Sequence, residues 1–182
     1  MFHAKKTVFS MTQKIFGAVF VLAVSFYIGM MLAANERRRV AALEAFYHLM
    51  ERIRDSIASL AQPISEICLQ YTDETLEKNG FLPRLRDLYQ NGMKTENILY
   101  RAILEQDAAH GFQMTAEDIS VLTNYAVSCG QEDSTGEVRR CTYYLSLLEK
   151  RLNDAKTALS ANTKISRALP LSLGGLLIIM LL

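Results

Sequence analysis

Residues 43–60 read LEAFYHLMERIRDSIASL, and their apolar residues recur at alternating intervals of three and four. The positions are Leu43, Phe46, Met50, Ile53, Ile57 and Leu60. Apolar residues at this spacing lie on one side of an α-helix, and so narrow a stripe is typical of a coiled-coil seam. The stretch therefore predicts a long amphipathic helix. Pro63 either ends this helix or lies in the first turn of the next one.

A second stretch repeats this pattern further along the chain. Its positions are Val138, Cys141, Leu145, Leu148, Leu152, Ala155, Leu159, Asn162 and Ile165. Asp133 or Ser134 can cap this helix, and Glu137 falls in its first turn. The two stripes predict either an antiparallel pair of helices within one chain or pairing with another copy, so a homo-oligomer is possible.

Shorter helical segments are expected between the two long helices, over residues 63–78, 82–89, 95–106 and 116–128. Asn-Gly pairs and Gly130 supply left-handed stops, and Thr115 with Asp118 three residues on resembles a capping box. Alternating β-branched residues are absent, so we expect no strand. The middle of the chain is predicted to be one α-helical domain.

Two segments are apolar enough to interact with a membrane. Residues 15–34 form a run of 20 without a charge, which as a helix covers about 30 Å, and a cleaved signal peptide is the alternative. Residues 168–182 are 15 residues without charge, which is short for a span, but the tail is apolar on every face. We expect both segments to cross the bilayer.

Lysine and arginine near each segment indicate its orientation. Five lysines and arginines follow the first segment, and three precede it. All the lysines and arginines near the second segment precede it. Both counts place the middle region in the cytoplasm. The expected organisation is a flank at 1–14, a transmembrane helix at 15–34, a soluble domain at 35–167 and a short transmembrane helix at 168–182. The fold class is all-α: a membrane-anchored helical bundle with two long antiparallel helices and shorter distal helices.

The chain has 182 residues, of which 50% are hydrophobic, and its net charge is +1. That near-neutral balance argues against a nucleic-acid-binding protein. The charge is nevertheless uneven: residues 55–149 carry seven basic and fifteen acidic side chains, whereas both flanking parts are basic. Either these are ordinary membrane flanks and solvated helices, or the bases contact anionic lipid and the acidic distal part contacts a basic partner.

No catalytic, cofactor-binding or metal-binding constellation is recognisable. The histidines His3, His48 and His110 are scattered, and His48 is expected to be a surface residue or a hydrogen-bonded helix residue and not a ligand. Cys68 and Cys141 fall among apolar residues and are expected to be buried. Cys129 lies beside a glycine at a helix end, where an exposed nucleophile is a minor hypothesis. The pairs Glu117-Asp118 and Glu132-Asp133 are better explained by helix capping than by acid–base chemistry.

Five short motifs recur in order along the chain: Lys14 to Ala18, Glu36 to Arg39, Gly130-x-x-Asp133, Asn162-x-Lys164-x-x-Arg167-Ala168-Leu169 and Gly174 to Ile179. With these motifs the chain resembles the stage III sporulation protein AB family of endospore-forming bacteria, from near Met11, itself a candidate true start, to its end. The middle, about 73–113, carries little that matches. The match is one of architecture, because none of these motifs is catalytic.

The resemblance implies a subunit of the channel-like complex between mother cell and forespore. Its soluble domain would lie in the mother-cell cytoplasm, anchored in the mother-cell membrane around the forespore. The domain would be similar to the cytoplasmic domains of the platform protein of type II secretion and type IV pili. A non-enzymatic scaffold that docks a secretion-type ATPase and organises other channel subunits is therefore expected, without cofactors. The alternative is a membrane-tethered sensor or receptor with the helical domain outside.

Overall fold

The computed structural model describes the backbone of residues 2–60, 62–92, 95–109 and 112–181, and most side chains between residues 17 and 163. It is all-helical over this part, as expected, and shows no strand there. The helices are α1 (Phe2–Leu60), α2 (Ile64–Gln70), α3 (Glu74–Lys78), α4 (Phe81–Gln90), α5 (Thr95–Ala108), α6 (Ala116–Ser128) and α7 (Ser134–Leu181).

The chain divides into two units that are described separately. Unit 1 comprises Met1–Asn35 and Thr157–Leu182, and unit 2 comprises Glu36–Lys156. Unit 2 therefore contains the last part of α1, helices α2 to α6 and the first part of α7. It lies inside the predicted soluble domain of 35–167.

In unit 1, large apolar side chains of α1 are exposed between residues 19 and 32, among them Phe20 at 69% and Tyr27 at 67%. Among the described residues, no helix combines the length and the apolar character needed to cross a bilayer. The predicted segment 15–34 contains several undescribed side chains, and the side chains of 168–182 lie outside the described residues. Both spans therefore remain predictions.

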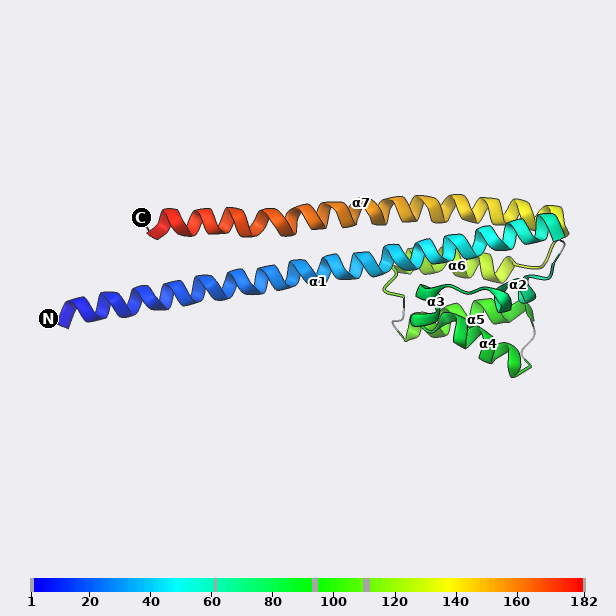
Figure 1. The fold of residues 1–182 in the computed structure, drawn as a ribbon, viewed down its shortest axis with the longest axis horizontal. Helices are drawn as coiled ribbons and strands as arrows, with labels where there is room; N and C mark the ends of the chain where they lie inside the picture. Colours follow the sequence, from blue (N-terminus) through cyan, green and yellow to red (C-terminus); the bar gives the residue numbers. More distant parts are fainter. Residues whose placement is uncertain (1, 61, 93–94, 110–111, 182) are drawn as a thin grey trace. The chain divides into compact units, whose positions relative to one another are not determined.

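In unit 2, α1 and α7 run antiparallel and pack together, seen in Figure 1 where the cyan part of α1 lies along the yellow part of α7. Glu44 of α1 pairs with Lys156 of α7 at 2.7 Å. The beginning of the first apolar stripe therefore lies beside the end of the second. The predicted stripe positions Leu43, Ile53 and Leu148 are fully buried. The two stripes therefore face each other within one chain.

The buried face of α1 is wider than the predicted narrow seam. Ala42, Ala45 and Leu49 of α1 are also buried, whereas Leu60 is 68% exposed. The reason is that α1 packs on more than α7, since the Phe46 ring contacts Phe81 and Phe112 with centroids 4.9 and 5.2 Å away. A helix that faces two layers buries a broader face than a coiled-coil helix does.

The shorter helices begin and end near the predicted stop residues, with one correction. Positive φ angles at Gly80, Gly92 and Gly130 provide the expected left-handed stops. The segment 63–78 is two helices rather than one, because the backbone is extended at Tyr71 and Asp73 then caps α3 by accepting from the Leu76 amide. Helix α5 packs between α4 and α6, which completes the layer beside α1.

Candidate functional site

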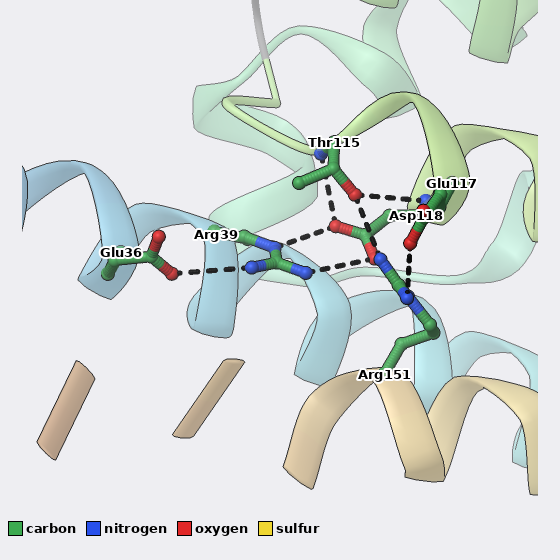
Figure 2. Close-up of polar contacts among 6 residues, drawn as sticks. All are labelled: Glu36, Arg39, Thr115, Glu117, Asp118 and Arg151. Atoms are coloured by element: carbon green, nitrogen blue, oxygen red, sulfur yellow. Dashed lines mark hydrogen bonds and ion pairs between the residues drawn. The ribbon is translucent and has the colours of Figure 1, made fainter. Parts of the chain in front are cut away.

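The first notable site in unit 2 is a buried carboxylate held between two arginines, which we name the Asp118 cluster. It comprises Glu36, Arg39, Thr115, Glu117, Asp118 and Arg151, drawn in Figure 2. Arg39 of α1 donates to Asp118 from Nε at 2.7 Å and from Nη2 at 3.2 Å. Arg151 of α7 donates from Nε to Asp118 Oδ1 at 2.7 Å. The cluster joins α1, α6 and α7 through one side chain.

Asp118 also forms the predicted capping box at the start of α6. Its Oδ2 accepts from the Thr115 amide at 3.0 Å, and the Thr115 hydroxyl accepts from the Asp118 amide at 3.3 Å. The same hydroxyl accepts from Arg151 Nη2 at 3.1 Å. Every oxygen of the carboxylate therefore has at least two donors, which is what a fully buried carboxylate needs.

The charges around Asp118 keep it ionised. Burial alone would raise its pKa, but the hydrogen bonds from Arg39, Arg151 and Thr115 outweigh that effect and lower the pKa below its ordinary value. Arg39 and Arg151 are themselves only 11% and 21% exposed. Removal of the carboxylate would leave two arginines without their main partner.

A second cluster lies where α6 ends and α7 begins, and we name it the Arg140 cluster: Glu132, Glu137, Arg140 and the backbone at Ser128 and Gly130. Arg140 pairs with Glu137 at 2.6 Å and also with Glu132, and it donates to the Ser128 carbonyl. Glu137 Oε1 additionally accepts from the Gly130 amide at 3.0 Å. The other oxygen, Glu137 Oε2, is buried without a hydrogen-bond partner among the described residues.

Beside the Arg140 cluster is a pocket of about 320 Å³. Its walls come from the end of α1, from α2, α4 and α5, and from the α6–α7 turn. Most lining side chains are apolar, and Glu132 and Glu137 are its charged residues among those described. Its size is in the range of pockets that bind a small molecule or a side chain of a partner.

The cysteines and carboxylate pairs lie largely where predicted. Cys68 and Cys141 are buried, and Asp118 and Asp133 both cap helices. The minor hypothesis that Cys129 is exposed was wrong, because its side chain is buried in the wall of the pocket, and burial raises the pKa of its thiol to about 12. A thiol held neutral in this way is a poor nucleophile.

Of the histidines, His48 is exposed and lies 3.3 Å from Glu51, as expected for a surface residue. The side chains of His3 and His110 lie outside the described residues. Within the part of the chain that the structure describes, no group of His, Cys, Asp or Glu is arranged to hold a metal ion.

Sequence analysis missed the arginines of the Asp118 cluster. Arg39 was counted as a membrane flank, although it precedes Leu43 by four residues and so continues the apolar stripe at the same spacing. A charged residue at a stripe position is a signal that a partner must be buried opposite it. That partner could have been sought among the helix caps.

The fold and these clusters define a helical module built on two long helices, tied together by a buried ion cluster. The chain belongs to the stage III sporulation protein AB family, whose model matches residues 14–182. Neither the curated proteins nor the solved structures contain a match. Membership of the family implies a component of a sporulation channel that associates with other channel subunits and with a membrane.

Proposed function

We propose that this protein is a non-enzymatic scaffold subunit of the channel complex between mother cell and forespore, and that it docks a cytoplasmic secretion-type ATPase. The observation that carries the proposal is the Asp118 cluster. It ties α1 at residue 39 to α7 at residue 151, close to the two borders of unit 2. A domain locked across both of its borders is suited to hold partners in a fixed arrangement.

The proposed anchors are residues 15–34 and 168–182. The exposed apolar side chains of α1 between residues 19 and 32 support the first anchor, because water-exposed apolar surface of this extent marks a membrane or protein contact. In this arrangement the soluble domain lies in the mother-cell cytoplasm, where a secretion-type ATPase could reach it.

The experiment is co-purification of the full-length chain with the ATPase and the other channel subunits from sporulating cells. We expect the ATPase to be retained with the wild-type chain and the other subunits to be lost from the membrane when the chain is deleted. The proposal fails if the chain does not retain the ATPase and its deletion leaves the other subunits in place.

Topology separates the scaffold from the alternative of a tethered sensor with its domain outside. Protease added to inverted membrane vesicles should digest residues 35–167, whereas protease added to right-side-out vesicles should leave them uncut. The opposite pattern would favour the sensor.

A further inference from the structure

Three consecutive arginines follow the exposed apolar part of α1, and they do not share one role. Arg39 points inward to Asp118, as Figure 2 shows, and its side chain is only 11% exposed. Arg37 and Arg38 are exposed, and neither forms an ion pair within the part of the chain that the structure describes. The run therefore contains one arginine that stabilises the fold and two that are available to a group outside the chain.

The acidic residues of α1 nearest to Arg37 and Arg38 are bound by other cations. Glu36 pairs with Arg39 at 3.5 Å, and Glu44 pairs with Lys156 at 2.7 Å. Residues 1–35 contain no aspartate or glutamate. The two exposed arginines thus present neighbouring positive charges on the helix surface, which favours an anionic partner.

These arginines continue an exposed apolar stripe on the same side of α1. The residues that follow one another there, at intervals of four, three and four, are Tyr27, Met31, Ala34 and Arg38. All four side chains are exposed, as is that of Arg37. From Ala34 to the two arginines the helix rises by only about 5 Å. An apolar surface that gives way to cations within one helical turn matches a phospholipid, in which acyl chains adjoin a charged headgroup.

We infer that Arg37 and Arg38 bind the headgroup phosphate of an anionic phospholipid whose acyl chain lies along the stripe from Tyr27 to Ala34. Guanidinium groups can each donate two hydrogen bonds to a phosphate. An anionic headgroup such as that of phosphatidylglycerol also lacks the ammonium group that would repel the arginines. The inference rests on the proposed anchor at residues 15–34 and extends it to the choice of lipid.

The test compares phosphatidylglycerol with phosphatidylcholine carrying the same acyl chains. Both lipids have the phosphate, but only phosphatidylglycerol has a net negative charge. The full-length chain in a non-ionic detergent is titrated with each lipid, and native mass spectrometry counts the lipid molecules bound. We expect phosphatidylglycerol to bind with the higher association constant, because each basic residue at an anionic lipid surface contributes a preference of about fivefold.

Variants assign the preference to this pair of arginines. In the double variant Arg37→Gln/Arg38→Gln, the preference should fall by about fivefold for each arginine removed, whereas Arg37→Lys/Arg38→Lys should retain most of it. Arg52→Gln, the same change at an exposed arginine further along α1, should leave the preference unchanged. Because Arg39 keeps its bonds to Asp118, all three variants should unfold at the urea concentration of the wild type.

Equal binding of the two lipids to the wild-type chain would overturn the inference, and so would an unchanged preference in Arg37→Gln/Arg38→Gln. An equal loss in Arg52→Gln would show a general effect of charge rather than a site. If the double variant keeps its lipid preference but loses another channel subunit on co-purification, the arginines bind protein instead.

Two further results separate this inference from the proposed function. Extraction of the chain from cell membranes by alkaline carbonate would overturn the anchor at residues 15–34, and the lipid site with it. A chain that stays in the membrane and retains the ATPase, but shows no preference for phosphatidylglycerol, would refute the lipid site alone.

Discussion

The N-terminal ends of α6 and α7 each have an aspartate in their capping arrangement, Asp118 at the third helical position of α6 and Asp133 just before α7, yet their surroundings carry opposite balances of charge. At α6, Asp118 is buried between two arginines, and its oxygens are saturated with donors. At α7, the cap Asp133 is exposed, and the neighbouring Arg140 lies between two glutamates, one of which has an oxygen without a described partner.

The difference separates a fully paired buried carboxylate from a partly paired one. Both oxygens of Asp118 have donors, so the Asp118 cluster is suited to stabilise the fold. In the Arg140 cluster, Glu137 Oε2 is buried with no hydrogen-bond partner among the described residues, so this carboxylate is stabilised less fully. Both clusters arise where helices begin or end, because backbone amides and the helix dipole already favour carboxylates there.

The largest effect is expected from Asp118→Asn. The N-cap of α6 is Thr115, and asparagine at 118 keeps an amide oxygen that can accept from the Thr115 amide, so the substitution removes the charge and leaves the capping box. Two largely buried arginines lose their shared buried carboxylate and keep only the more exposed Glu36 and Glu117, so we expect a loss of about 3–5 kcal/mol in the free energy of unfolding. Urea denaturation followed by tyrosine fluorescence measures it, since the chain has no tryptophan.

Asp133→Asn is the matched control at the start of α7. Its side chain is exposed and accepts from the Gly136 amide, and the arginine pairs of this region, over the residues described, go to Glu132 and Glu137 instead. We expect a change within about 0.5 kcal/mol. Equal effects of the two substitutions would show that capping, rather than the buried ion cluster, accounts for the role of Asp118.

Acid should remove the same charge from the wild-type chain. The folded-state pKa of Asp118 is lowered, so its stabilisation is fully present above the unfolded pKa of about 3.9 and is lost as pH falls toward the folded value. The difference in unfolding free energy between wild type and Asp118→Asn should be constant from neutral pH to about pH 5 and shrink below about pH 4. Other carboxylates titrate in both chains, so they cancel. A constant difference down to the acid limit would contradict the assignment.

The helices and much of the core could be predicted from the sequence, but the charged clusters could not be assembled from it. The spacing of Leu145, Leu148 and Leu152 is set by local helix geometry, and all three are buried as expected. The Asp118 capping box is also local, and it was predicted. The contacts of Arg39 and Arg151 with Asp118 span 79 and 33 residues, so they depend on how the helices pack.

A smaller effect is expected from Gly136→Ala in the first turn of α7. Alanine normally stabilises a helix relative to glycine, but here the added methyl would lie 2.8 Å from Glu132 Cβ and 2.9 Å from Asp133 Oδ1. We expect a loss of about 1–3 kcal/mol in unfolding free energy, because Glu132 must leave Arg140 to make room. Thr135→Ala, at the exposed neighbouring position, is the control. Unchanged or increased stability of Gly136→Ala would show that the Glu132 contact is dispensable.

Smaller still should be the effect of reversing charge at the exposed ion pairs of α4 and α5. Arg84 pairs with Asp87 and with Glu105, and these side chains are 38 to 51% exposed. Surface pairs contribute about 0–1 kcal/mol, so Asp87→Arg should change unfolding free energy by no more than that. A larger loss would mean that these pairs stabilise the fold as the Asp118 cluster does.

The smallest effect is expected from Cys129→Ser. The Cys129 thiol lines the pocket, and burial raises its pKa to about 12, so it stays neutral at physiological pH and is not an activated nucleophile. We expect wild-type spore counts from the Cys129→Ser strain. In the native protein, a thiol-specific maleimide should label Cys129 slowly at neutral pH, with rapid labelling only after unfolding in urea. Loss of sporulation in a variant that remains folded would revive a catalytic role for this thiol. Normal sporulation, together with a strong defect in Asp118→Asn, would instead locate the chain's contribution in its architecture, as the contrast between the two clusters requires.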